Sequence, residues 1–164
     1  MGQFFVREYC EDDEDELIAI HDLARPVELR GSCDPRAFVP LRNDAKDFNE
    51  FRACRKLVAF AHGRIHGFVG IGNLEIGWLY VRPDSSRQGI GRRLLSRAMA
   101  LIQKDNVSGT AVSVFVLEAN KPAITLYESQ GFKIIETFKS KNNGYPCKVH
   151  KMLSNHNFNC AITD

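Results

Sequence analysis

The chain has 164 residues, of which 44% are hydrophobic and 26% charged, an ordinary composition for a globular protein of one domain. The formal net charge of +2 does not favour nucleic acid as a partner. No apolar run approaches the ~18 residues of a membrane-spanning helix, and the N-terminus lacks the pattern of a signal peptide. We therefore expect a cytoplasmic protein with no membrane partner.

The cysteines are scattered and include no CxxC pair, which predicts a reducing compartment and no zinc site. We expect inert thiols rather than nucleophiles, and no metal. The cysteines are Cys10, Cys33, Cys54, Cys147 and Cys160.

The N-terminal half predicts strands alternating with helices. Acidic residues from Glu11 onward suit the first turn of a helix, and Pro26 is expected to end it. His62-Gly63 between two apolar runs predicts a hairpin. The expected elements are a strand over 4–9, a helix over 11–24, a loop over 25–41, a helix over 44–56, and strands over 57–61, 65–71 and 75–81.

The C-terminal half continues the alternation. The clearest helix spans 91–104, because its apolar residues recur on one face. The remaining expected elements are a strand over 111–117, a helix over 121–129, and two strands, 132–138 and 147–153, linked by a loop over 141–146. We expect one α/β or α+β domain over 1–153, with helices on both faces of a mixed sheet, and a polar tail over 154–164.

A glycine-rich turn follows the strand that ends at Val81. Glycine at 89 and 91 leaves backbone N–H groups unobstructed, and the helix that follows directs its positive dipole end at the same place. A P-loop would need Lys followed by Ser or Thr, and a dinucleotide fingerprint would need a small residue where Leu94 stands. The pattern therefore predicts a site for clustered phosphates. Added positive charge comes from Arg87, Arg92 and Arg93.

A second motif, Asn-x-x-Ala-x-x-Leu-Tyr-x-x-x-Gly-Phe, runs from Asn120 to Phe132. Asn120 suits a helix N-cap and Gly131 a helix exit. Together with the strand, Gly-x-Gly and helix before it, this motif resembles the GNAT superfamily of acyl-CoA-dependent N-acetyltransferases, over residues 57–138. The resemblance implies a central mixed, mostly antiparallel sheet flanked by helices on both faces, with acetyl-CoA as acyl donor and an amine as acceptor.

The resemblance also implies roles for single residues. Strand backbone before the glycine turn would meet the pantetheine arm, the turn would hold the pyrophosphate, and Tyr127 would lie near the thioester sulfur. Ser86 departs from the family, whose members usually carry Gln or Arg there; we expect a modest effect, because backbone amides do much of the binding. The expected coenzyme contacts are Leu79, Tyr80, Val81, Arg87, Gln88, Gly89, Ile90, Gly91, Arg92 and Asn120.

Acyl transfer to an amine needs a base for the amine and benefits from an acid at the departing thiolate. Tyr127 suits the acid, because a neutral phenol can give its proton to sulfur. Glu75 is the candidate base, since the family often places a carboxylate there, although a solvated strand end fits equally; His66 and Glu118 are next. Phe115 stands where acetylases of protein N-termini place a carboxylate, which argues against a ribosomal-protein acetylase.

By the same resemblance, the loop over 25–41 should contribute to the acceptor pocket. Glu28 or Asp34 could hold a cationic amine, and Arg30 or Arg36 a carboxylate. The leading interpretation is an N-acetyltransferase that moves an acetyl group from acetyl-CoA to a primary amine of a small molecule or peptide by direct attack. The alternative is a non-catalytic acyl-CoA-binding regulatory module. The acceptor and the presence of a homodimer stay open.

Overall fold

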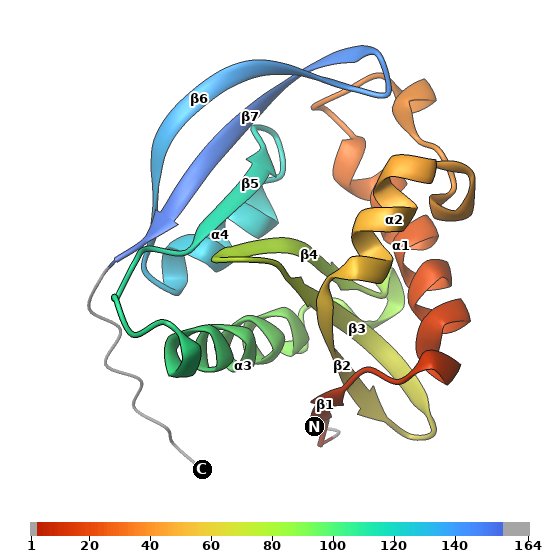
Figure 1. The fold of residues 1–164 in the computed structure, drawn as a ribbon. Helices are drawn as coiled ribbons and strands as arrows, with labels where there is room; N and C mark the ends of the chain where they lie inside the picture. The colour runs from red at the N-terminus through yellow and green to blue at the C-terminus, as the bar shows by residue number, and fades with distance from the viewer. Residues whose placement is uncertain (1–2, 156–164) are drawn as a thin grey trace.

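A computed structural model gives the fold, which is described for residues 3–155. These residues form one seven-stranded sheet in the order β1-β2-β3-β4-β5-β7-β6 (Figure 1). Every neighbouring pair is antiparallel except β4 and β5, so the predicted mixed, mostly antiparallel sheet is confirmed. The strands are β1 Phe5–Glu8, β2 Arg55–Ala61, β3 Arg64–Ile71, β4 Glu75–Val81, β5 Ser113–Leu117, β6 Phe132–Asn142 and β7 Tyr145–Ser154.

Helices cover both faces of the sheet, as predicted (Figure 1). The apolar sides of α1 and α2 share one buried cluster with Val58 and Phe68 of the sheet. Helices α3 and α4 share the other cluster, with Val69 and Val114. The helices are α1 Glu14–Leu29, α2 Ala45–Ala53, α3 Ile90–Asp105 and α4 Lys121–Ser129, with short 3-10 helices at Glu11–Asp13, Pro35–Ala37, Leu41–Asn43 and Pro83–Ser85.

Helix α1 continues past Pro26 to Leu29, so the prediction that Pro26 ends it is wrong. A proline inside a helix removes one backbone hydrogen bond and costs about 3 kcal/mol. Leu29 offsets that cost: its side chain is 1% exposed and packs with Ala37 and Leu117. The extra turn also carries Glu28.

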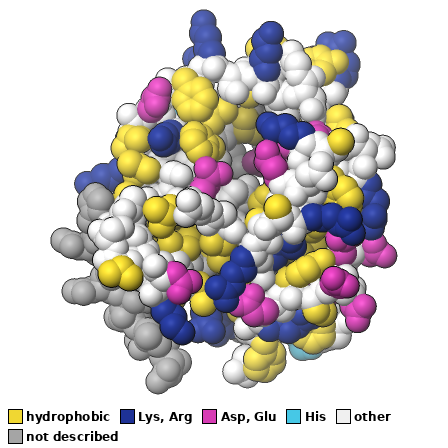
Figure 2. Space-filling model, in the orientation of Figure 1, with side chains coloured by type: hydrophobic (Ala, Val, Ile, Leu, Met, Phe, Trp, Pro, Cys, Tyr) yellow, Lys and Arg dark blue, Asp and Glu magenta, His cyan; other side chains and the backbone are white. Residues whose placement is uncertain are grey.

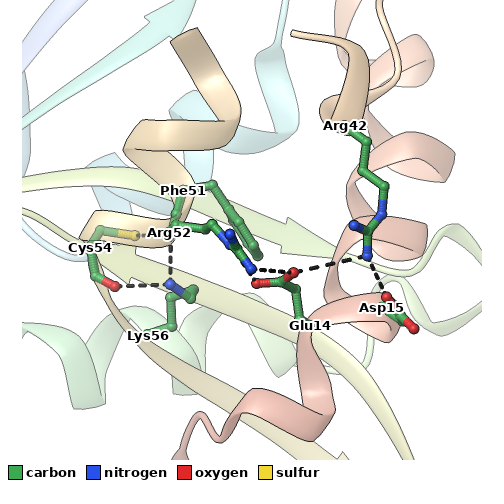
Figure 3. Close-up of polar contacts among 7 residues, drawn as sticks. All are labelled: Glu14, Asp15, Arg42, Phe51, Arg52, Cys54 and Lys56. Carbon is green, nitrogen blue, oxygen red and sulfur yellow. Dashed lines mark hydrogen bonds and ion pairs between the residues drawn. The ribbon is translucent and has the colours of Figure 1, made fainter. Parts of the chain in front are cut away.

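Helix α2 is shorter than predicted, and Lys56 belongs to β2 instead. The Lys56 side chain is 3% exposed, and its Nζ donates to the carbonyl oxygens of Phe51 at 2.5 Å and Cys54 at 3.0 Å (Figure 3). These carbonyls end the helix and have no later turn to bond with. A buried lysine therefore caps the C-terminal end of α2.

Charged side chains also link α2 to α1 (Figure 3). Glu14, at the start of α1, accepts from Nε of Arg52 on α2 at 3.1 Å. Arg42, just before α2, pairs with Asp15 and lies 3.9 Å from the Glu14 carboxylate. Exposed pairs of this kind each stabilise a fold by less than about 1 kcal/mol, but here they fix one helix beside another.

The β6–β7 hairpin is longer than predicted, because the expected loop over 141–146 is only a two-residue turn. Asn143 and Gly144 both have positive φ, 47° and 85°, as the tight turn of a twisted hairpin requires. Strand β7 extends to Ser154, which is 6% exposed and donates its N–H to the carbonyl of Val112, so the predicted tail does not start there. Residues 156–164 of that tail, including Cys160, lie outside the described residues.

Candidate active site

The parallel strands β4 and β5 meet over only two residue pairs, Glu75 with Ser113 and Ile76 with Val114. Beyond these pairs, and among the described residues, β5 pairs with β7 and β4 with β3. The edge of β4 that faces β5 is therefore unpaired over residues 77–81. The backbone that was expected to meet a pantetheine arm, residues 79–81, lies on this open edge.

The N-terminal end of α3 lies just beyond the same strand. Its N-cap, Gly89, has φ 78° and no side chain to cap the helix. The first bond of the helix runs from the N–H of Arg93 to the Gly89 carbonyl at 3.0 Å, which leaves the N–H groups of residues 90–92 for an outside acceptor. Arg87 and Arg92 are exposed and form no ion pair with any residue in the range 3–155. Amides and cations thus gather where a pyrophosphate would bind.

Gly91 and Arg93 have structural tasks beside this site. A Cβ on Gly91 would lie 3.2 Å from Cδ2 of Leu126, so glycine lets α3 approach α4 closely. Arg93 donates from Nη1 to the carbonyl of Phe4 at 2.6 Å and ties α3 to the chain before β1. The glycine motif alone predicted neither the close approach at Gly91 nor the hydrogen bond of Arg93.

Tyr127 and Asn120 belong to α4. Asn120 caps that helix by accepting from the N–H of Ala123 at 3.4 Å. Tyr127 is 6% exposed, with its ring 5.6 Å from that of Phe132. Its hydroxyl bonds to none of the described residues, and no fully buried polar side-chain atom among them lacks a partner, so the hydroxyl reaches open space. Burial raises the pKa of Tyr127 above its usual range, and the Glu28 carboxylate raises it further. The phenol therefore stays protonated near neutral pH.

A cavity of about 500 Å³ opens on the side of β4 covered by α1 and α2 (Figure 2). Trp78 and Tyr80 face this side, whereas Leu79 and Val81 pack toward α3. The opposite wall comes from β5 and β7, and the tip of the β6–β7 hairpin arches across (Figure 1). The charged residues that line the cavity are Arg25, Glu28, Asp47, Glu50, Glu75 and Lys141.

Three of the lining residues form one half-buried polar group. Tyr80 donates from its hydroxyl to Oε2 of Glu28 at 2.9 Å, and Nη1 of Arg25 lies 2.7 Å from the same oxygen. Burial raises the pKa of Tyr80 well above its usual range, and Glu28 adds to the effect. The loop residue expected to hold a cationic amine, Glu28, is thus in the cavity, but on the last turn of α1.

The candidate bases lie in different surroundings. Glu75 lines the cavity where β4 and β5 are still paired, and its carboxylate bonds to none of the described residues. His66 is 7% exposed and lies between Ser85 Oγ at 2.9 Å and the Ala61 carbonyl at 3.2 Å. Both imidazole nitrogens of His66 are therefore occupied, and this side chain supports the turn before the phosphate site instead.

The other candidates lie at the surface. Glu118 pairs with Lys148 at 3.8 Å. Asp34 pairs with Arg36 at 2.7 Å, and the hydrogen bonds from Arg36 lower the pKa of Asp34 to about 2. Within residues 3–155, no group of three His, Cys, Asp or Glu side chains could hold a metal ion, and no helix is long and apolar enough to span a membrane.

The sequence analysis missed His21, Arg25, Asp47 and Glu50 as lining residues. A signal was available in α1, because residues 21, 25 and 28 are spaced as one face of a helix. Because the helix was predicted to end before Pro26, Glu28 was assigned to a loop and the pattern was not recognised.

Comparisons with known proteins agree with this geometry. Residues 52–134 match the family profile described as "Acetyltransferase (GNAT) domain". A Bacillus subtilis protein, UPF0157 protein YqkA, is 39% identical over 67 residues, which are 41% of this chain and 18% of that protein. The chain therefore matches less than a fifth of that relative.

Solved structures share the fold over nearly the whole chain. A Rhodopseudomonas palustris protein described as a GCN5-related N-acetyltransferase superposes with a TM-score of 0.81 and 19% identity, over 94% of this chain and 97% of that one. The PaiA N-acetyltransferase of Thermoplasma acidophilum, solved with coenzyme A, superposes with a TM-score of 0.72 and 19% identity, over 93% of this chain and 99% of that one. The YncA protein of Salmonella typhimurium, solved with acetyl-CoA, superposes with a TM-score of 0.71 and 17% identity, over 98% of each chain. With the motifs, the divided sheet and the family match, this chain belongs to the GNAT family of acetyltransferases.

Proposed function

We propose that this protein transfers the acetyl group of acetyl-CoA to a primary amine of a small molecule or peptide by direct attack. The observation that carries the proposal is the short pairing of β4 with β5, which leaves an open edge of β4 beside the cavity and before the end of α3 that lacks a side-chain cap. The relatives solved with coenzyme A and acetyl-CoA support a coenzyme at this edge.

The coenzyme contacts follow from the open groups around this edge. The N–H groups of Ile90, Gly91 and Arg92 bind the pyrophosphate, and the Arg87 and Arg92 side chains add charge. Gln88 and Gly89 complete the turn. The open edge of β4 at residues 79–81 bonds to the pantetheine amides, beside Asn120.

The reaction needs a base for the amine and an acid for the thiolate. Glu75 accepts a proton from the ammonium form of the acceptor, directly or through water, and the neutral amine attacks the thioester carbonyl. A backbone N–H of residues 79–81 stabilises the oxyanion. When the C–S bond breaks, Tyr127 gives its proton to the departing thiolate, and the second proton of the attacking nitrogen passes to the phenolate, which restores Tyr127 and leaves a neutral amide.

Two measurements test the proposal. Calorimetry should show binding of acetyl-CoA, weaker after Arg87→Ala and Arg92→Ala but unaltered by Arg97→Ala, an exposed arginine farther along the same helix. Thiol release from acetyl-CoA should then accelerate with one or more members of a panel of primary amines. Binding without acceleration by any amine would overturn the enzymatic proposal and leave a regulatory acyl-CoA-binding module.

A further inference from the structure

His21 presents an unused hydrogen-bond acceptor to the cavity. Its side chain is 4% exposed, and its Nδ1 lies 2.8 Å from Oδ1 of Asp22. The same carboxylate oxygen accepts the N–H of Leu41 at 2.9 Å, which fixes its position. Because a carboxylate only accepts, Nδ1 carries a proton, and in the neutral imidazole Nε2 keeps a lone pair.

The Nε2 atom faces the cavity. It bonds to none of the residues 3–155, and no fully buried polar side-chain atom in that range lacks a partner, so Nε2 is not completely buried. The open surface that His21 lines is the cavity. The rings of Tyr80 at 5.1 Å and Trp78 at 5.8 Å meet the imidazole edge to face and hold its direction. An acceptor held in this way requires a ligand that donates an N–H or O–H.

The charges around His21 favour a positive ligand. Asp47 and Glu50 lie one turn apart on α2 and line the same cavity. Burial raises the pKa of Asp47, and the carboxylates of Asp44 and Glu50 raise it further, whereas Arg25 and Lys46 lower it; the net effect is a raised pKa, so a further cation beside Asp47 would be favourable. Arg25, which also lines the cavity, is paired with Glu28 at 2.7 Å.

The amine that is acetylated cannot be this cation throughout the reaction. It must lose a proton before attack, and it ends as a neutral amide. A second ammonium group keeps its charge from binding to release. Three N–H donors on one such group suit the acceptors of His21, Asp47 and Glu50.

We propose that the acceptor is a diamine, whose second, protonated amine binds to His21 Nε2, Asp47 and Glu50 while the first amine is acetylated. This inference rests on the proposed function and adds the substrate class. A cavity of about 500 Å³ lies within the range of small-ligand sites.

The test compares 1-aminobutane with 1,4-diaminobutane as acceptors at neutral pH. We expect kcat/KM of the wild-type protein to be at least about tenfold higher for the diamine, equivalent to about 1.4 kcal/mol. Asp47→Asn and Glu50→Gln should reduce this ratio through KM of the diamine. The control is Asp12→Asn, which removes an exposed carboxylate outside the cavity and should keep the ratio.

A pair of variants tests the imidazole itself. His21→Gln places an amide oxygen near Nε2 and should preserve part of the diamine preference, whereas His21→Leu should lose it. Circular dichroism checks that each His21 variant folds. If neither His21 variant folds, the Asp47→Asn and Glu50→Gln variants still test the diamine site.

Binding separates this inference from the proposed function. Calorimetry with each amine, in the presence of CoA, should show tighter binding of the diamine than of 1-aminobutane, and weaker diamine binding after Asp47→Asn. Equal binding or equal kcat/KM of the two amines would overturn the inference. Preferred diamine binding with no acetylation of any amine would uphold it and overturn the proposed function alone.

Discussion

Tyr127 combines a buried ring with a hydroxyl that has no partner among the described residues, an arrangement suited to donating a proton. Tyr127→Phe keeps the ring against Phe132 and removes only the donor. We expect turnover to fall by about 10²–10⁴-fold, with little change in acetyl-CoA affinity, since the lost interaction belongs to the transition state. Thiol release and calorimetry measure the two quantities.

Tyr9→Phe is the control for this substitution, because Tyr9 lies beside β1 and does not line the cavity. Full turnover in a folded Tyr127→Phe protein would assign the hydroxyl a structural role. Water would then protonate the thiolate.

Replacing either glycine of the phosphate turn should destabilise the protein, but for a different physical reason in each case. Gly91→Val presses on Leu126, and overpacking of this kind costs about 1–3 kcal/mol. At Gly89 a Cβ would meet no atom within 4 Å, but φ is +78°, and a left-handed backbone costs a branched residue about 1–2 kcal/mol. Urea unfolding of both variants should show a loss of stability.

Leu126→Ala distinguishes the two causes in double-mutant cycles. We expect it to recover part of the stability lost in Gly91→Val and none of that lost in Gly89→Val. Additive free energies of unfolding in both cycles would exclude the packing role assigned to Gly91.

At the scale of elements, the Lys56 cap on α2 predicts a pH dependence of stability. Burial lowers the pKa of Lys56 below its ordinary 10.5. Between the two values the unfolded chain binds more protons than the folded one, so the free energy of unfolding rises with pH in that window, by at most about 1.4 kcal/mol per pH unit. Lys56→Met removes this contribution, and the advantage of the wild-type protein should grow as pH increases toward 10.5.

Urea unfolding of both proteins at several alkaline pH values measures this difference. Lys46→Met, at an exposed lysine of the same helix, serves as the control and should show no such trend. A constant difference between wild type and Lys56→Met across the window would contradict the assigned shift.

Elements whose signals are local could be predicted from the sequence, and those decided by distant contacts could not. The periodic apolar face of α3 and the His62-Gly63 turn lie within a few residues of what they specify. The end of α1 depends on Leu29 packing against Leu117, 88 positions away, so Pro26 was misleading. Asn143-Gly144 was a readable turn signal that the prediction overlooked.

The same limit applies to the site. The glycine turn and the Asn120–Phe132 motif are continuous in sequence, which is why their spacing indicated a coenzyme site. The cavity joins α1, α2, β4 and the C-terminal hairpin. Tyr80 and Glu28 meet across 52 residues, and no local pattern reports such a pair.

At the scale of the whole molecule, the short contact between β4 and β5 predicts that a bound coenzyme stabilises the folded sheet. A ligand between these strands bonds to strand edges that are otherwise unpaired, and at 100 times its Kd it adds about 2.7 kcal/mol to the free energy of unfolding. CoA should therefore raise Tm and slow hydrogen exchange of amides in residues 77–81. Exchange slowed equally over the sheet, without emphasis on β4, would argue for binding elsewhere.

The alternation of side chains along β4 has a kinetic consequence. Trp78 and Tyr80 face the cavity, while Leu79 and Val81 face α3, so donor and acceptor approach one strand from opposite sides and neither blocks the other. In the proposed direct attack, both must be present together before the C–S bond breaks. Double-reciprocal plots should therefore intersect rather than run parallel, and mass spectrometry of protein mixed with acetyl-CoA alone should find no acetylated intermediate.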